Sequence, residues 1–189
     1  MEPALQFARL LWLAVFVLWV ILGRMRKRTV ASSSNARVWI ALWGVMLAWL
    51  ILFSRAFRPG LLAERFLPVN PAIAYSGLAL TAAGLGFAAW ARFAIGRNWG
   101  SMITVQQDHR LMRTGPYAIV RHPIYSGLIL ATLGTAIIVG ELGGLVSVAL
   151  VAISWGHKAR LEESFMIEQF GAEYDEYRRS TKRLIPGIW

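Results

Sequence analysis

The chain has 189 residues, of which 57% are hydrophobic and 16% are charged, and its mean hydropathy is +0.50. Soluble domains average about 25% charged residues, so this composition indicates a protein whose main solvent is the lipid bilayer. The formal net charge is +10 and there is no cysteine, which excludes disulfides, thiolate chemistry and cysteine-ligated metal sites. No compact basic motif with interleaved aromatic residues favours nucleic-acid binding.

The first candidate membrane span comprises residues 4–23. The basic cluster at residues 24–28 follows this span rather than preceding it, and no small-residue cleavage site comes after it. We therefore expect a retained membrane helix and not a signal peptide. A basic, serine-rich loop leads to a second span, residues 38–54, which contains no charge inside it. About 20 apolar residues cross a bilayer as a helix, which suits both segments.

A third span lies within residues 71–91, after a turn-rich stretch. It contains Gly77, Gly84 and Gly86, and small residues on a helix surface allow a neighbouring helix to approach closely. The polar stretch that follows, residues 92–121, is too long for a tight turn. We expect it to form a loop at the membrane surface.

The fourth and fifth apolar segments, residues 123–139 and 145–156, are short, and the sequence GELGG separates them. This pattern predicts a hairpin of two helices that are tilted or only just span the bilayer. A charged helix is expected from His157 onward, before the final KRLIPGIW. The fold class that we predict is an all-α integral membrane protein with about five transmembrane helices.

The distribution of Lys and Arg predicts the orientation of these spans. With five helices, sixteen of the 20 Lys and Arg residues fall on one side of the membrane, and four fall on the other, namely Arg9, Arg55, Arg58 and Arg65. Because basic loops stay in the cytosol, we expect the N-terminus outside and the C-terminus in the cytosol. The polar stretch and the charged helix then share the cytosolic side and can contribute to one site.

Residues 115–127, GPYAIVRHPIYSG, place polar and turn-forming residues between apolar stretches. Pro123 suits the first turn of a helix, and the residue before a proline is driven to extended geometry, so His122 should lie at the mouth of the fourth span. Together with the free N–H groups of that helix terminus, Arg121 and His122 predict an anion-binding corner. Taken singly, the same residues also suit interfacial anchors, and the two tyrosines suit an aromatic belt.

A second polar cluster begins where the fifth apolar segment ends. Lys158 and Glu162 have i, i+4 spacing, and Glu163 follows directly. The simplest interpretation is a salt bridge on a solvated helix, worth a few tenths of a kcal/mol. An anion corner and a carboxylate on one membrane surface also suit a zwitterionic cofactor that meets a lipophilic substrate. Neither a Ser–His–Asp set with an acyl pocket nor an H-E-x-x-H zinc motif is present, so neither a hydrolase nor a zinc site is favoured.

These motifs resemble the isoprenylcysteine carboxyl methyltransferase family, with its phospholipid and small-thiol methyltransferase relatives. The resemblance covers residues 97–188, about half of the chain, and rests on RHPIYSG followed by EE, FG and YDEY at the family's spacing. It implies a multi-spanning enzyme that binds S-adenosylmethionine from the cytosol and methylates a lipophilic acceptor. In that arrangement residues 1–91 would hold three transmembrane helices, and residues 92–189 would form the catalytic region with the hairpin.

The resemblance also implies a set of site residues. The expected cofactor-binding residues are Gln106 (or Gln107), His109, Arg110, Leu111, Met112, Tyr117, His122, Pro123, Ile124, Tyr125 and Glu162. Members of the family often carry an arginine one turn before the first glutamate, near the acceptor, and here Lys158 occupies that place, with Arg160 two residues on. Lys158, Arg160 and Arg121 are therefore the expected catalytic residues. Lysine lacks the bidentate fork of arginine, so the identity of the acceptor stays open.

Several acceptors and two other classes of protein remain possible interpretations. The favoured acceptor is the carboxylate of a prenylcysteine-like substrate, which would reach the site laterally between the third helix and the hairpin. A lipid amine and a small thiol are the alternatives, and membrane lipids are the expected surroundings. A small membrane transporter or a non-catalytic assembly protein would share the apolar spans, but a transporter would favour charged or broken helices at mid-bilayer.

Overall fold

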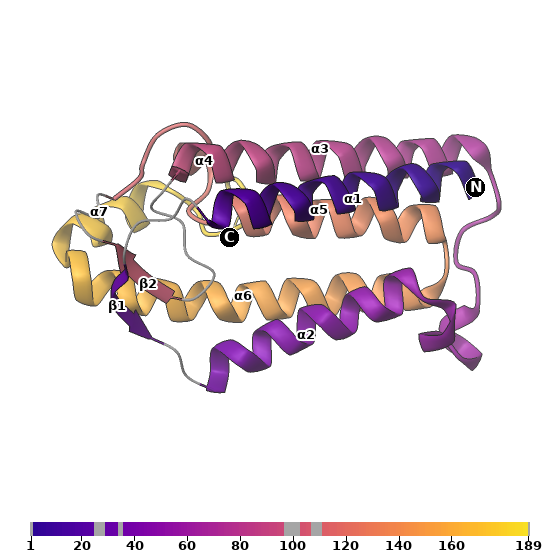
Figure 1. Ribbon diagram of the computed structural model, residues 1–189, viewed down its shortest axis with the longest axis horizontal. Coiled ribbons are helices and arrows are strands. Elements are labelled where there is room, and N and C mark those ends of the chain that lie inside the picture. Colours follow the sequence, from indigo (N-terminus) through magenta and orange to yellow (C-terminus); the bar gives the residue numbers. More distant parts are fainter. Residues whose placement is uncertain (1, 25–28, 34–35, 97–102, 107–110, 189) are drawn as a thin grey trace.

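The computed structural model describes residues 2–24, 29–33, 36–96, 103–106 and 111–188. Figure 1 shows long helices that run side by side, with the strands and the C-terminal helix at one end and the N-terminus at the other. The elements in chain order are α1 (Glu2–Gly23), β1 (Thr29–Ser33), α2 (Ala36–Phe53), η1 (Arg55–Phe57), η2 (Gly60–Ala63), α3 (Pro71–Ile95), β2 (Ile103–Gln106), α4 (Pro116–Ile119), α5 (Pro123–Val139), α6 (Leu142–Phe170) and α7 (Ala172–Ser180).

Four of these helices, α1, α2, α3 and α6, are long and apolar enough to cross a membrane by length and composition. The helix α5 is also apolar and has 17 residues, near the lower limit of about 17–25 residues for a span. Together they confirm the predicted all-α membrane fold with about five transmembrane helices. The helix α5 begins and ends where the sequence predicts.

The largest difference from the sequence prediction is the length of α6. The fifth apolar segment and the charged helix that follows it form one continuous helix of 29 residues, so the last span is not a short one. No proline interrupts this stretch, and Gly171, with a φ of 53°, ends it. Because the helix is continuous, the face of α6 that packs in the bundle extends as far as Lys158 and Glu163.

A small antiparallel sheet was also not predicted. The strand β1 follows α1 and pairs with β2 from the polar stretch, with Thr29 opposite Gln106 and Ser33 opposite Ile103. Both segments contain β-branched residues, TVASS and ITVQ, which favour strands. The pairing links two connections that are far apart in the sequence.

Close packing of α3 against α5 depends on glycine. A Cβ atom at Gly84 would lie 2.5 Å from the backbone nitrogen of Ala131, and one at Gly77 would lie 2.7 Å from the carbonyl oxygen of Gly134. Gly77 and Gly84 thus allow the close approach that the sequence predicts. Gly86 differs, because a Cβ atom there would have no heavy atom within 4 Å.

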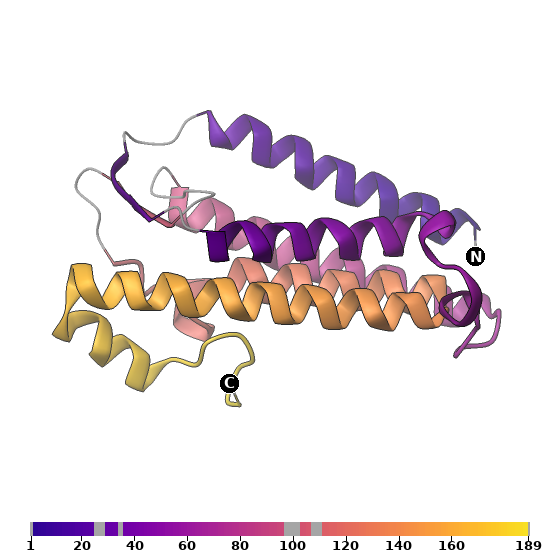
Figure 2. The ribbon, with the colours of Figure 1, turned by 90° about the horizontal axis from the view of Figure 1, so that it is seen from below.

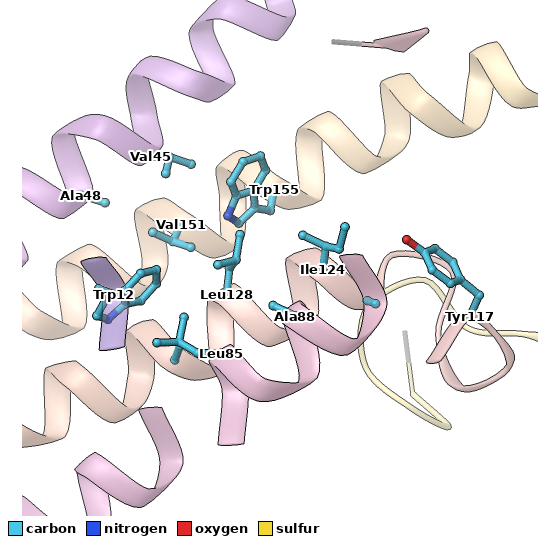
Figure 3. Packing of buried hydrophobic residues seen from close by; sticks show 12 residues of the cluster. Trp12, Val45, Ala48, Leu85, Ala88, Tyr117, Ile124, Leu128, Val151 and Trp155 are labelled. Carbon is cyan, nitrogen blue, oxygen red and sulfur yellow. The ribbon is translucent and has the colours of Figure 1, made fainter. Parts of the chain in front are cut away.

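The helix α1 packs closely over only part of its length. Its buried residues are Ala4, Ala8 and Trp12, all in the N-terminal half, and beyond them the helix diverges from the bundle (Figure 2). The Trp12 indole belongs to the main apolar cluster, which Figure 3 shows with side chains from α1, α2, α3, α5 and α6. The divergence leaves space between α1, α2 and the α5–α6 pair.

A buried ion pair ties the opposite end of the bundle together. The guanidinium of Arg58 lies 2.8 Å from the carboxylate of Glu141, in the turn between α5 and α6. It also donates to the terminal carbonyl oxygens of α2, Ile51 at 2.8 Å and Leu52 at 2.6 Å. The GELGG sequence is therefore an anchored turn at the end of the helices and not a break within a span.

Candidate functional site

The candidate site forms where three segments meet: the start of α5, the second half of α6 and the residues after α7. The backbone N–H of Arg121 donates to the carbonyl of Lys182 at 2.8 Å, and that of His122 donates to the carbonyl of Arg183 at 3.1 Å. These bonds hold the C-terminal segment beside the first turn of α5. Pro123 supplies no N–H of its own and begins the helix, as the sequence predicts.

Glu163 is the centre of one half of the site. Its carboxylate accepts from Arg121 Nε at 2.9 Å and from Arg183 Nη2 at 2.7 Å, and it lies 3.2 Å from His122 Nε2. The residue is 3% exposed, so these charges face one another largely away from water. Arg121 and His122, which the sequence predicts to form an anion-binding corner, thus both face a carboxylate of the protein itself.

Glu162 is the centre of the other half. Its carboxylate accepts a hydrogen bond from the hydroxyl of Tyr125 at 2.6 Å, forms a salt bridge with Lys158, and lies 3.4 Å from His122 Nδ1. The ammonium of Lys158 donates to the same Tyr125 hydroxyl at 2.6 Å. Because Lys158 is only 2% exposed, the i, i+4 pair is not the solvated surface salt bridge of the simplest interpretation.

His122 connects the two halves. Its two ring nitrogens face different carboxylates, and an imidazole that donates from both nitrogens carries a positive charge. Burial by itself would lower the pKa of His122, but the carboxylates of Glu162 and Glu163 outweigh it and hold the pKa above its ordinary value. The site therefore holds His122 in a setting that favours the imidazolium.

Three aromatic rings lie in a stack beside these charges. The Trp155 and Tyr125 rings are 4.6 Å apart between centroids with an interplanar angle of 5°, and His122 and Tyr125 are 5.5 Å apart at 4°. The ammonium of Lys158 is 5.2 Å from the centroid of the Tyr125 ring. The faces of electron-rich rings attract cations, so this stack adds a surface for positive charge.

An apolar cavity of about 560 Å³ reaches the site from the membrane-spanning part of the protein. Its walls come from α1, α2, α5 and α6, and the groups that line it are almost all apolar or aromatic. Lys158 and Tyr125 line this cavity and also contact Glu162. They belong to what we call the charged cluster, which consists of Arg121, His122, Tyr125, Lys158, Glu162, Glu163 and Arg183. The cavity thus joins a hydrocarbon-like space to a compact set of charges.

This location differs from the predicted lateral path between the third helix and the hairpin. Backbone contacts at Gly77 and Gly84 close the interface between α3 and α5. The space lies instead between α1 and α2, where α1 diverges from the bundle. The difference arises because the small residues that promote packing are concentrated on α3 and α5.

The short helix α4 is held from the side by α7. The Tyr177 hydroxyl donates to the carbonyl of Tyr117 at 2.5 Å, and Arg113 forms ion pairs with Glu173 and Glu176, each at 3.3 Å. Tyr117 is buried, and burial raises the pKa of its phenol. The α7 helix therefore holds in place the segment of chain that leads into α5.

Comparison with known proteins assigns the chain to a family. The model of the phospholipid methyltransferase family matches residues 73–173, which is more than half of the chain. The chain belongs to this family. The match includes α3, α4, α5 and α6, and hence most of the charged cluster described above.

Three similar curated members carry the same kind of name. A rice protein (Oryza sativa subsp. indica), a probable protein-S-isoprenylcysteine O-methyltransferase, is 29% identical over 121 residues, which are 61% of this chain and 62% of that protein. The protein-S-isoprenylcysteine O-methyltransferase of Schizosaccharomyces pombe is 34% identical over 83 residues, 43% of this chain and 35% of its own. The Saccharomyces cerevisiae protein of that name is 36% identical over 86 residues, 44% and 35%.

These matches confirm the predicted resemblance to isoprenylcysteine carboxyl methyltransferases and their phospholipid relatives. The matched region spans 62% of the rice protein and about a third of each yeast protein. Within this methyltransferase family, the structure brings several predicted residues together. Those in or beside the charged cluster are Arg121, His122, Pro123, Ile124, Tyr125, Lys158 and Glu162.

The other predicted residues lie further from the charged cluster or outside the described part of the chain. Arg160 is exposed on α6, whereas Lys158 lines the cavity, because two residues turn a helix by about 200°. Met112 packs against the main apolar cluster and Leu111 is half-buried beside it in sequence. His109 and Arg110 lie outside the described residues. Only the backbone of Gln106 is described, at the end of β2.

Three residues of the site were not predicted: Glu163, Arg183 and Trp155. Glu163 is the second glutamate of the EE motif, and Arg183 lies in KRLIPGI, so both stood in the quoted resemblance without a role. No spacing in the sequence indicates that residue 183 folds back onto residue 163. In the sequence, Trp155 looks like any other apolar residue of a membrane span. Only the structure shows that its ring stacks on Tyr125.

Proposed function

We propose that this protein is a membrane-embedded, S-adenosylmethionine-dependent methyltransferase that transfers a methyl group to a lipophilic acceptor, and that the acceptor is the carboxylate of a prenylcysteine-like substrate. The observation that carries the proposal is the apolar cavity that ends at Lys158 and Tyr125. A lipid tail suits the apolar walls, and a polar head would then lie at the charged cluster. Family membership supports the type of reaction.

The donor set of the cluster fits the proposed cofactor. The carboxylate of Glu162 suits its ammonium group, and the stacked faces of Tyr125 and Trp155 suit a sulfonium cation. The indole N–H of Trp155 is buried without a hydrogen-bond acceptor among the described residues, so it is a further donor for a ligand. We propose that His122, Pro123, Ile124 and Tyr117, with Gln106, His109, Arg110, Leu111 and Met112, complete this pocket.

When bound, S-adenosylmethionine supplies an electrophilic methyl group. A carboxylate acceptor needs no general base, so the protein has to align the carboxylate oxygen and remove water from it, which can contribute several kcal/mol. The apolar walls exclude water, and the Lys158 ammonium attracts the acceptor carboxylate. We assign Lys158 as the acceptor-facing catalytic residue, with Arg121 acting through Glu163 and Arg160 at the exposed edge.

The acceptor head group would meet Lys158 at the end of the cavity. Lys158 already faces the carboxylate of Glu162, and a lysine offers a single-point charge instead of the flat fork of an arginine. A lipid amine is therefore the second candidate, and the match to the phospholipid methyltransferase family favours it over a small thiol. A panel of prenylcysteine, amine-lipid and thiol acceptors with labelled methyl donor distinguishes the three.

We further propose that the N-terminus faces the outside, and that the site and the C-terminus face the cytosol. In that topology residues 1–91 contribute three spans, and residues 92–189 contribute the charged cluster and the last two spans. The basic side chains near the site, Lys158, Arg121 and Arg183, agree with the positive-inside rule. Membrane lipids and the lipidated substrate are the proposed partners.

Glu162→Gln tests the cofactor assignment. Replacing the carboxylate by an amide removes the negative charge that would face the cofactor ammonium, so we expect binding of S-adenosylmethionine to weaken by at least tenfold. Calorimetric titration of purified protein in nanodiscs measures this change. The matched control is Glu168→Gln, which alters an exposed carboxyl on the same helix. Equal affinities in the two variants would remove Glu162 from the cofactor pocket.

A further inference from the structure

We propose that Trp12 determines the length of lipid tail that the cavity accepts, and thereby selects among lipophilic acceptors. This inference rests on the proposed function, because it treats the cavity as the site for the acceptor tail. Trp12 lines the cavity from α1, and its own side chain is 9% exposed. It lies far from the charged cluster, so its role would be in specificity and not in the chemical step.

The sequence of α1 explains why the cavity ends at this residue. On the inward face, small residues come first, with Ala4 1% exposed and Ala8 0% exposed, so the helix approaches its neighbours closely there. Trp12 is the last buried residue of α1. Further along α1, Val15, Phe16 and Trp19 line the cavity, and of these Val15 and Trp19 are only partly buried against the main apolar cluster. The change from small to large side chains holds the second half of α1 away from the bundle.

The Trp12 indole is fixed in place by specific contacts. Its N–H donates to the Thr135 hydroxyl at 3.0 Å, and that hydroxyl in turn donates to the carbonyl of Ala131 at 2.9 Å. The ring also meets Trp49 and Phe53 of α2 edge to face, with centroids 5.3 Å and 6.1 Å apart. A side chain held by α5 and α2 at once is a rigid wall for a flexible tail.

Trp12 also lies at the end of the cavity opposite Lys158. Its partner Thr135 is ten residues beyond Tyr125 along α5, a distance of about 15 Å, or half of the roughly 30 Å hydrocarbon core of a bilayer. Figure 3 shows Trp12 separated from Ile124 and Tyr117 by Leu128. The cavity that leads away from the charges therefore extends over about one leaflet.

Beyond Trp12 the interior is filled. Leu52, Ala136 and Val139 form a buried cluster there, against which Leu5 and Phe53 pack. A tail longer than the cavity would have to displace the Trp12 indole or these residues, and overpacking of a filled core typically costs about 1–3 kcal/mol. Longer tails should therefore be disfavoured at this residue.

The test compares acceptors that carry the same head group and prenyl tails of ten, fifteen, twenty and twenty-five carbons. For the wild type we expect kcat/KM to fall sharply between two successive members of the series. In Trp12→Ala the fall should move to the next longer member, so that the ratio of kcat/KM for the longer tail over the shorter one rises by about tenfold or more. Trp12→Leu should give a smaller shift in the same direction, and it serves if Trp12→Ala does not fold.

Trp19→Ala is the matched control, because it removes the same side chain from the cavity wall two turns nearer the charged end. It should change kcat/KM for all tails together without moving the position of the fall. The inference is overturned if the wild type shows no fall, if Trp12→Ala and Trp12→Leu leave it in place, or if Trp19→Ala moves it equally.

Competition binding against a labelled fifteen-carbon compound separates this inference from the proposed function. If the wild type binds these compounds but methylates none, the proposed function fails, and the dependence of binding on tail length still decides the role of Trp12. If the wild type methylates them and Trp12 has no effect on the length preference, the inference fails and the proposed function stands. If the wild type binds none of them, both fail.

Discussion

At Glu163, one carboxylate faces three basic side chains, Arg121, Arg183 and His122, on two separate segments of the chain. Its neighbour Glu162 faces Lys158 and the Tyr125 hydroxyl. The two adjacent glutamates therefore share His122 but otherwise have different partners. We infer that Glu163 acts as a structural centre that positions His122, while Glu162 remains the carboxylate nearest the cavity.

Glu163→Gln tests this division. The amide keeps the shape of the side chain but leaves buried positive charges without their counterion, which typically costs about 3–5 kcal/mol. We therefore expect a marked fall in the thermal unfolding midpoint of the detergent-solubilised protein. Glu176→Gln is the control, because it removes one partner of the exposed ion pair with Arg113. This substitution should change the unfolding midpoint little. A midpoint that is unaltered in Glu163→Gln would exclude a structural role for this network.

The pH dependence of stability should report the same contacts. Because the pKa of His122 is raised in the folded protein, the contribution of its imidazolium is fully present below the unfolded pKa of about 6.5 and is lost as pH rises through the folded value. In Glu163→Gln one of the two carboxylates that raise this pKa is missing. The stability difference between wild type and variant should therefore shrink as pH increases above neutrality.

At the scale of elements, glycine placement decides which helices pack and which leave a space. Gly77 and Gly84 on α3 face Gly134 and Gly127 on α5, where backbones come into contact. On α1 the last buried small residue is Ala8, and the larger side chains of Trp12, Val15 and Trp19 follow on the face that lines the cavity. The same bundle thus has one closed interface and one cavity, and the difference follows from side-chain size.

Gly84→Ala and Gly86→Ala form a matched pair on one helix. A methyl group at Gly84 would collide with the backbone of α5, so we expect a loss of about 1–3 kcal/mol in unfolding free energy. Gly86 has open space around it, and alanine favours a helix over glycine by about 0.5–1 kcal/mol, so that variant should be neutral or more stable. Chemical unfolding of both variants checks the contrast, which would disappear if α3 and α5 were not closely packed.

At the scale of the whole molecule, α7 and the N-terminus lie at opposite ends of the helices (Figure 1). The charged cluster lies at the α7 end, where Arg121 donates to the carbonyl of Arg178 at 3.2 Å. The basic residues near the cluster predict that this end is cytosolic. The opposite end is held by the buried Arg58–Glu141 pair. Under the proposed function, the cofactor would enter from water at the end with the charged cluster, and the acceptor would enter from the lipid between α1 and α2.

The absence of cysteine from the sequence makes the orientation easy to measure. Leu61→Cys places a single thiol at an exposed position of η2, and Ala172→Cys places one at the exposed start of α7. In intact cells we expect a membrane-impermeant maleimide to label the first variant only, and to label both after permeabilisation. The unmodified protein is the blank. Labelling of Ala172→Cys alone in intact cells would reverse the proposed topology.

The amino-acid sequence was enough to predict the membrane class, the first four spans and several of the residues that meet in the charged cluster. These features depend on local properties of the chain. They are the runs of apolar residues, the backbone restriction that Pro123 imposes on His122, and sequence motifs shared with a family. The contacts of Glu163 with Arg121, the return of Arg183 to the site and the position of the cavity between α1 and α2 are visible only in the folded protein. These outcomes depend on contacts between segments far apart in the chain, where side-chain size and charge act together and no sequence spacing records them.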